Sequence, residues 1–349
     1  MRSVRLCGLC GAVLRRCRRA SARRSATRKA IPQRAFSLAA VFCLPAFAQV
    51  IGVNNFIHSV ADLDKTTAFY RDTLGLELKN APRAPMVLNE ALSNLTDTHG
   101  AKFRVATFKV PDAGFDLELT EFTGIDHKPG IARNQDPGAA TFVLTVRDLD
   151  KALAAVKKAG VALVTVGGAP LSLGGKTRSI FVRDPDGMFI ELFQPDPLPE
   201  TTAPASSNVI GGRFAMTVKD TAKTLEFYKT VFGFDTKPGD AFAGNPIVSN
   251  LVDVQGAQFR MSRATVPGSS VTWEFVDYKG VDRKPFALRI PDPGSPAFSL
   301  RVSNADALVT AVKAAGGSVV STGGPLGAKA GSIFVRDPNG FLIELIQRP

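Results

Sequence analysis

The stretches VRDPDGMFIELFQP (residues 182–195) and VRDPNGFLIELIQRP (residues 335–349) decide the fold, because they predict the same β-hairpin twice. Each contains a turn sequence in which proline presets φ and glycine accepts a positive φ. Side chains alternate along a strand, so Glu191 and Ile190 point to opposite faces. A buried carboxylate needs a cation, a hydrogen-bond donor or a proton. Glu191 and its counterpart Glu344 are therefore expected to face an enclosed space.

The sequence contains an internal duplication that begins well before these hairpins. GAKFRVATFKV (residues 100–110) matches GAQFRMSRATV (residues 256–266), and a segment rich in Pro, Ser and Thr separates the two copies. The duplication predicts a first domain over residues 51–197, a linker over 198–207 and a second domain over 208–348.

Each half also contains a shorter repeat, in which a strand leads into a helix that opens on Asp or Asn and stops at Gly. An N-cap acceptor and a C′ glycine are typical helix boundaries. About three strand-like runs follow every helix, so the unit is β-α-β-β-β. The fold class is α+β, and two units side by side are expected to form a curved mixed sheet that encloses a cavity. The four predicted helices span residues 62–75, 148–160, 220–233 and 304–316.

These modules resemble the vicinal oxygen chelate superfamily, which includes glyoxalase I, bleomycin-resistance proteins, methylmalonyl-CoA epimerase and extradiol dioxygenases. The resemblance rests on FIHSVADLDKTTAFYRDTLGLEL (residues 56–78), DLELTEF (116–122), RDLDKALAAVKKAG (147–160) and the two hairpins. It implies two domains of paired modules. It does not imply one reaction, because the superfamily includes isomerases, lyases, dioxygenases, transferases and binding proteins.

The resemblance also implies a divalent metal in each cavity, bound by the first and last strands of the paired modules. All four last-strand positions are Glu here, but none of the first-strand positions is the usual His or Gln. The expected set of the first domain is Asn55, Glu118, Thr141 and Glu191, and that of the second domain is Arg213, Glu274, Ala297 and Glu344.

In the second domain no metal is expected, because a guanidinium and a divalent ion cannot share one space. Arg213 is expected to neutralise Glu274 and Glu344 by charge-assisted hydrogen bonds. If the strand register is shifted by one residue, Arg213 instead points outward.

In the first domain three interpretations remain open. Asn55, Glu118, Thr141 and Glu191 offer oxygen ligands suited to Mg²⁺, Mn²⁺ or Ca²⁺. Without a metal, two facing carboxylates push one pKa up, so that one of Glu118 and Glu191 stays protonated and the two form a catalytic acid/base pair. In the third interpretation, both glutamates hydrogen-bond amides of the pocket and orient a bound ligand. His58 is expected to face the helix side of its strand, unless a bulge turns it toward these glutamates.

The first 48 residues are interpreted as a leader that is removed from the folded protein. They contain no acidic residue and contribute eleven of the formal net charge of +12, so the basic balance gives no indication of a nucleic-acid partner. An apolar run ending in AFA predicts an export signal cleaved after Ala48 and a periplasmic or secreted protein; a mitochondrial transit peptide is the alternative. The run is too short and too interrupted by Pro for a stable membrane span. All four cysteines lie in this segment.

The sequence leaves enzyme and binding protein both open. The first hypothesis is a lyase or isomerase of the glyoxalase type, acting on a carbonyl-containing small molecule with the glutamates of the first domain. The second is a non-catalytic binder of apolar or aromatic compounds. Extradiol cleavage is disfavoured, because it needs a site of two histidines and one carboxylate. The sequence is compatible with a homodimer.

Overall fold

The computed structural model describes residues 49–323 and 331–348. The predicted leader and its cleavage site after Ala48 lie outside the described residues. No helix within the described ranges is long and apolar enough to cross a membrane.

The chain forms four modules of similar order. Module 1 contains β1 (Val50–Ser59), α1 (Leu63–Ala68) with a π-helical turn η1 (Phe69–Thr73), β2 (Glu77–Asn80), β3 (Met86–Val87), α2 (Glu90–Thr96), β4 (Lys102–Lys109) and β5 (Asp116–Thr123). Module 2 contains β6 (Ala140–Val146), α3 (Leu149–Lys158), a 3₁₀ turn η2 (Val166–Gly168), β7 (Leu171–Gly174), β8 (Thr177–Arg183) and β9 (Phe189–Gln194).

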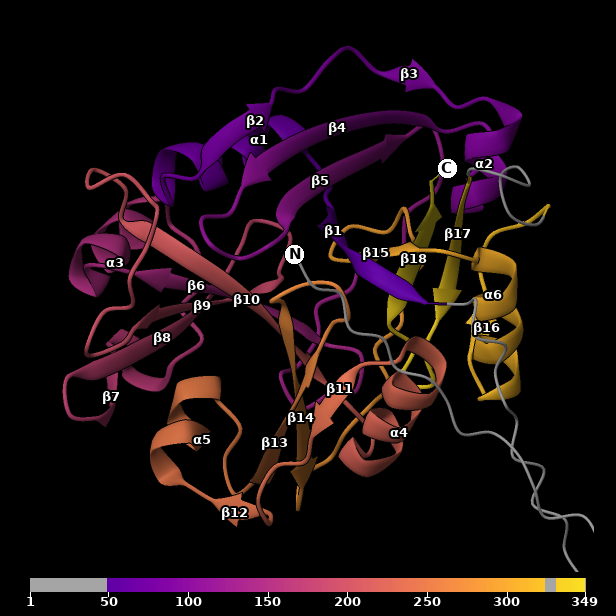
Figure 1. Cartoon of the computed structure of the whole chain (residues 1–349). Coiled ribbons are helices and arrows are strands. Elements are labelled where there is room, and N and C mark those ends of the chain that lie inside the picture. The colour runs from indigo at the N-terminus through magenta and orange to yellow at the C-terminus, as the bar shows by residue number, and fades with distance from the viewer. Residues whose placement is uncertain (1–48, 324–330, 349) are drawn as a thin grey trace, which may run out of the picture. The chain divides into compact units, whose positions relative to one another are not determined.

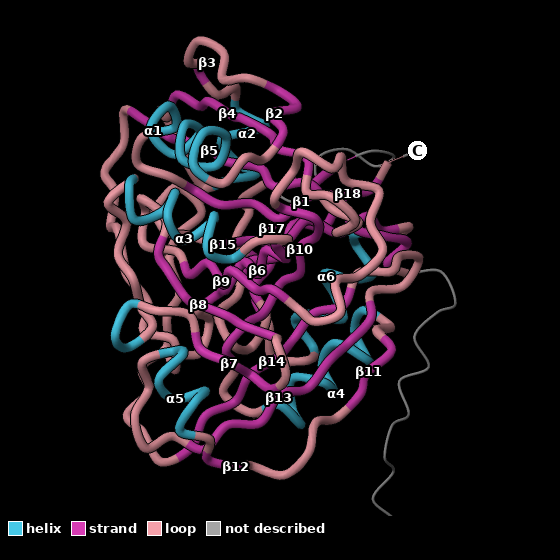
Figure 2. The backbone as a smooth tube through the Cα atoms, turned by 90° about the vertical axis from the view of Figure 1, so that its left-hand side faces the viewer, coloured by secondary structure: helices cyan, strands magenta, loops and turns pink. Residues whose placement is uncertain are grey.

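Modules 3 and 4 follow the linker. Module 3 contains β10 (Val209–Thr217), α4 (Thr221–Phe232), β11 (Asp235–Lys237), β12 (Ala243–Gly244), α5 (Pro246–Val252), β13 (Gln258–Thr265) and β14 (Thr272–Lys279). Module 4 contains β15 (Pro296–Val302), α6 (Ala305–Ala314), β16 (Ser318–Val319), β17 (Gly331–Arg336) and β18 (Leu342–Gln347). Figure 2 shows the helices outside the strands that they connect.

The helix boundaries predicted from the sequence are confirmed. Each N-cap side chain accepts a hydrogen bond from a backbone N–H three residues later, which satisfies one of the free donors of the first turn. The four N-caps are Asp62, Asp148, Asp220 and Asn304. The closing glycines have positive φ, as a C′ residue requires; they are Gly75, Gly160, Gly233 and Gly316.

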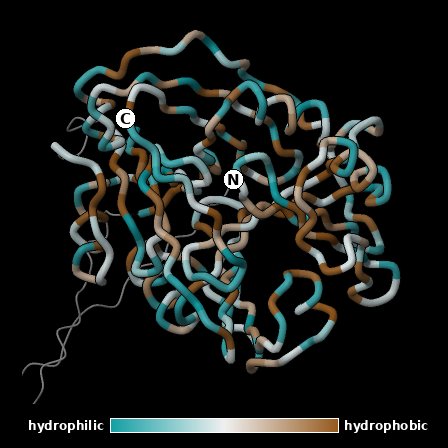
Figure 3. Tube along the Cα trace, turned by 180° about the vertical axis from the view of Figure 1, so that it is seen from behind, coloured by the Kyte–Doolittle hydropathy of each residue, from teal (hydrophilic) through white to brown (hydrophobic). Residues whose placement is uncertain are grey.

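The strands form two nine-stranded mixed sheets, which confirms the α+β class with curved sheets. Sheet A has the order β16-β17-β18-β15-β1-β5-β4-β2, with β3 beside β4. Sheet B has the order β11-β13-β14-β10-β6-β9-β8-β7, with β12 beside β13. Hydropathy changes from residue to residue along many strands, as expected where the two faces of a sheet differ (Figure 3).

The strand order shows which modules share a sheet. Module 1 pairs with module 4 through antiparallel β1 and β15, so the indigo start of the described chain lies beside its yellow end (Figure 1). Modules 2 and 3 pair through β6 and β10, with Val146 opposite Val209. β9 is parallel to β6, and β10 is antiparallel to β6. The last residues of β9 and the first residues of β10 therefore lie at the same end of the strands, and the linker joins them there.

Equivalent phenylalanines of the four first strands form the contact between the sheets. Phe56 of sheet A lies 5.6 Å from Phe142 and 5.1 Å from Phe214 of sheet B, measured between ring centroids. Phe298 lies 5.3 Å from Phe214. All four rings are fully buried. This aromatic centre fixes one face of each first strand in the core. The residue before each phenylalanine must then face the opposite side, where the candidate sites lie.

Candidate functional site

The eight positions expected to form two sites do form two clusters, but in different combinations from those predicted. The sequence analysis grouped modules 1 and 2, and modules 3 and 4, whereas each sheet combines one module from either half. The predicted four-ligand set of the first domain is therefore wrong as a set. The repeats are too similar for the sequence to specify which first strands pair. Site A consists of Asn55, Glu118, Ala297 and Glu344; site B consists of Thr141, Glu191, Arg213 and Glu274.

Site A is a pair of carboxyl groups with one amide. Asn55 on β1 donates through Nδ2 to Oε2 of Glu118 on β5, at 2.6 Å. Burial raises the pKa of Glu118 to about 7, and the nearby charge of Glu344 adds to this rise, while the Asn55 hydrogen bond offsets part of it. Burial also raises the pKa of Glu344 on β18. The pair therefore retains a proton at a pH where an ordinary glutamate has lost it.

Apolar side chains lie beside the carboxyl groups of site A. Phe334 lies directly across the strand pair from Glu344, and Ala297 lies opposite Ile57 between the two acids. Apolar neighbours disfavour the ionised form of a carboxyl group. At Glu344 this effect of burial outweighs hydrogen bonds from Ser299 and Ser332 and the charge of Arg348. The buried cluster comprises Ile57, Leu88, Leu95, Ala101, Phe122, Ile290, Ala297, Phe334 and Leu342.

Site B is an ion-paired cavity. Arg213 on β10 donates through Nε to Oε2 of Glu274 on β14, at 3.2 Å, and its Nη2 lies 3.7 Å from Oε2 of Glu191. Arg263 on β13 donates through Nε to Oε1 of Glu274, at 3.1 Å. The predicted pairing of Arg213 with Glu274 is confirmed. The predicted pairing with Glu344 is wrong, because Glu344 belongs to sheet A.

Arg263 is a site residue that the sequence analysis missed, although the repeat contains the signal. In the aligned copies Arg263 corresponds to Thr107, and each lies directly across the strand pair from the glutamate of the last strand. Comparing the two copies position by position would have shown that the second one gained an arginine next to its glutamate.

Neither site offers the set of metal ligands that the family resemblance implies. In site A one of the four positions is Ala297, which has no ligand atom, and the amide of Asn55 directs a donor at Glu118. In site B the guanidinium of Arg213 occupies the space between the two glutamates. A cationic side chain in that place opposes a divalent cation by direct repulsion.

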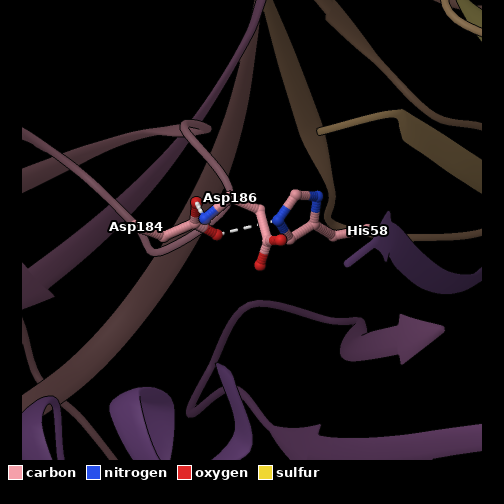
Figure 4. Close-up of side chains that lie close together, drawn as sticks. All are labelled: His58, Asp184 and Asp186. Atoms are coloured by element: carbon pink, nitrogen blue, oxygen red, sulfur yellow. Dashed lines mark hydrogen bonds and ion pairs between the residues drawn. The ribbon is translucent and has the colours of Figure 1, made fainter. Parts of the chain in front are cut away.

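Among the described residues, one group of three has ligand atoms within 4.8 Å of one another, namely His58, Asp184 and Asp186. Figure 4 shows His58 and Asp184 joined by a close contact with Asp186 beside them, and the distance from His58 Nε2 to Asp184 Oδ2 is 2.8 Å. His58 and Asp184 are completely buried side chains.

Protein donors already occupy the carboxylate oxygens of this group. Tyr70 donates its hydroxyl hydrogen to Oδ2 of Asp184, and Thr66 donates to Oδ2 of Asp186. Backbone N–H groups donate to Oδ1 of both aspartates. The second half has the same arrangement without an imidazole, because Met216 replaces His58 and Tyr228 bonds Asp337. The group therefore has a structural role, because its hydrogen bonds hold module 1 against the β8–β9 turn.

The three histidines do not form a metal site with two histidine ligands. The register of β1 is irregular between Val53 and Phe56, but His58 still lies on the face opposite Asn55 and Glu118, so the triad of His58 with Glu118 and Glu191 does not form. His99 is exposed, and Nδ1 of His127 lies 3.0 Å from the carbonyl oxygen of Pro291.

Replacing His58 with Met, the residue of the equivalent position, is expected to change how stability depends on pH. Burial opposes protonation of His58, but the charges of Asp184 and Asp186 outweigh it and raise the pKa. The stabilisation is therefore present below the usual imidazole pKa and is lost as pH rises through the raised value. Urea unfolding between about pH 6 and pH 9 should show this loss in the wild type and not in His58→Met. Parallel pH profiles of the two proteins would contradict the pairing.

Comparisons with known proteins agree with this architecture. The family model described as Glyoxalase/Bleomycin resistance protein/Dioxygenase superfamily matches residues 52–192 and 212–345. The chain is 29% identical over 181 residues to a probable chloroplastic lactoylglutathione lyase of Arabidopsis thaliana, covering 51% of this chain and 43% of that protein. It is 27% identical over 179 residues to a lactoylglutathione lyase of Oryza sativa subsp. japonica, covering 51% and 52%. The chain thus spans about half the length of the curated relatives it matches.

Among solved structures, glyoxalase I from Zea mays superimposes with a TM-score of 0.55 at 19% identity, covering 86% of this chain and 92% of that one. This likeness concerns the fold.

Proposed function

Because the chain belongs to the glyoxalase/bleomycin resistance protein/dioxygenase superfamily, we propose that it is a lyase or isomerase that moves a proton next to the carbonyl group of a small molecule. We place this reaction at site A. The observation that supports it is the convergence of Glu118 and Glu344, two half-buried carboxyl groups whose pKa values burial raises, with the charge of Glu344 adding to the rise at Glu118. Paired groups whose pKa values are shifted toward neutrality are typical of acid/base catalysis.

The two carboxyl groups have complementary roles in the proposed reaction. Ionised Glu118 removes the proton from a carbon next to the carbonyl, and protonated Glu344 gives its proton to the carbonyl oxygen, which yields an enediol. Glu118 then returns its proton to the former carbonyl carbon, and the hydroxyl of the neighbouring carbon returns a proton to Glu344. The product is an isomer of the substrate, so no oxidant or further reactant is needed. The amide of Asn55 keeps the carboxylate of Glu118 in place.

The matched relatives are named for lactoylglutathione, and we propose a thioester or thiol adduct of this kind as the first substrate to test. The substrate class rests on this sequence likeness alone.

The test is formation of S-lactoylglutathione from methylglyoxal and glutathione, followed by mass spectrometry, with protein dialysed against a chelator. We expect turnover above the uncatalysed rate that survives chelation, because the proposed steps use side chains alone. Turnover that appears only after Mg²⁺, Mn²⁺ or Ca²⁺ is added would contradict the metal-free mechanism. Absence of turnover under both conditions would remove this substrate.

A second candidate function is binding without chemistry, as in the resistance proteins of the family. A cavity of about 280 Å³ at site B favours it. Its walls are mostly apolar, and Arg213 pairs with Glu274 within it, which suits the retention of a ligand better than proton transfer.

A further inference from the structure

We propose that site B binds a small monocarboxylate with an apolar or aromatic body, and that Arg213 binds the carboxylate group. The inference concerns a different site from the proposed reaction and does not depend on it. It rests on the shape of the cavity, on the free donors of Arg213 and on the balance of charge within the site.

The cavity of site B is small and has both charged and apolar lining residues. All four positions of the site line it, and the other walls include Phe181, Phe193, Leu251 and Met261. Its volume of about 280 Å³ lies just below the range of pockets for drug-sized ligands, so a ligand of about ten heavy atoms is the appropriate size. A lining that combines charged groups with apolar side chains matches a ligand that has one charged end and an apolar body.

The guanidinium of Arg213 has hydrogen-bonding capacity that the protein does not use. Within residues 49–323 and 331–348 its only hydrogen bond is the one from Nε to Glu274. The 3.7 Å from Nη2 to Glu191 is too long for a hydrogen bond. Arg213 lies over the ring of Phe193, 4.6 Å from its centroid, which fixes the plane of the guanidinium. A planar guanidinium with free terminal nitrogens matches a carboxylate in two-point geometry.

The charges of site B favour a monoanion over a dianion. Glu274 accepts from the Nε atoms of both Arg213 and Arg263, so one carboxylate serves two guanidinium groups. Glu191 accepts a hydrogen bond from Ser179 at 2.7 Å, and burial raises its pKa. The raised pKa of Glu191 lowers the cost of placing a second carboxylate near it, and a monoanion is repelled less by Glu274 than a dianion is.

The equivalent positions of site A indicate that both arginines are particular to site B. Asn55 replaces Arg213, and Thr107 replaces Arg263. The substitution Arg213→Asn therefore gives site B the same side chain that occupies the equivalent position of site A.

The experiment is titration calorimetry of the whole chain with phenylacetate and with phenylacetamide, which has almost the same shape and no charge. We expect binding of phenylacetate, and binding of phenylacetamide that is weaker by about tenfold or more, because the charge-assisted hydrogen bonds are lost. Arg213→Asn should weaken phenylacetate to the same extent. Arg178→Asn, which removes a guanidinium from an exposed ion pair with Asp150 on the same sheet, should leave the affinity unchanged.

A second variant tests the cavity independently of Arg213. Ala215 lines the cavity two residues further along β10, and Ala215→Leu should abolish binding by filling the space while leaving every charge in place. The inference is overturned if phenylacetate does not bind, if the amide binds equally well, or if both Arg213→Asn and Ala215→Leu bind like the wild type. Equal affinities for acetate and phenylacetate would also overturn it, because the apolar body would then contribute nothing.

Discussion

Replacing Glu118 with Gln is expected to lower kcat/KM of the site A reaction by about 10²–10⁴-fold, the usual contribution of a general base. Glutamine has nearly the shape of glutamate and preserves the packing, but it cannot accept the proton. Glu77→Gln on β2 is the matched control, because Glu77 is an exposed glutamate of the same sheet, and its rate should equal that of the wild type.

The pH profile adds a second readout to this prediction. Since burial and the charge of Glu344 raise the pKa of Glu118 to about 7, the wild-type rate should fall as pH drops below this value and protonates the base. A Glu118→Gln variant that retains the wild-type rate and profile would show that another group removes the proton.

Replacing Arg213 with Ala is expected to lower the free energy of unfolding by about 2–4 kcal/mol, somewhat less than the loss of a fully buried ion-pair partner. The side chain of Arg213 is 31% exposed, while that of Glu274 is only 7% exposed. Removing the guanidinium leaves Glu274 with Arg263 alone and deprives Glu191 of its cation.

Urea denaturation at neutral pH measures this change. Arg178→Ala is the control, because an exposed ion pair contributes less than about 1 kcal/mol, and the Arg178 and Asp150 side chains are 33% and 69% exposed. If Arg213→Ala loses no more stability than the control, the charge cluster of site B is not a stabilising element of the fold.

The local structure could be predicted from the sequence because short-range chemistry determines it. The helix caps at Asp62 and Asp148 and the turn after Asp184 depend on side chains that bond their own backbone neighbours. The orientation of Glu191 follows from strand alternation once Ile190 is assigned to the core.

The pairing of the modules could not be predicted in the same way. The four first strands have similar patterns, and the phenylalanines at the centre of the fold are equivalent in all of them. No local feature distinguishes one partner from another, so the grouping of Glu118 with Glu191 was an assumption from chain order. The pairing of β10 with β6 is a property of the assembled sheet and not of any one repeat.

The partner of His58 also could not be predicted from the sequence. Its strand parity correctly excluded the cavity, but Asp184 lies 126 positions later and meets His58 only because module 2 packs beside module 1. The contrast of His58 with Met216 shows that the repeat tolerates either residue at this place.

The central claim is that module 1 and module 4 together form one acid/base pair, with Glu118 from module 1 and Glu344 from module 4. Carbon-13 NMR titration of the glutamate carboxyl groups tests it most directly, in the wild type and in Glu344→Gln and Glu191→Gln. The account predicts that the pKa of Glu118, about 7 in the wild type, falls in Glu344→Gln and is unchanged in Glu191→Gln. A fall in Glu191→Gln alone would contradict it, because Glu118 would then share its site with the neighbouring module in sequence.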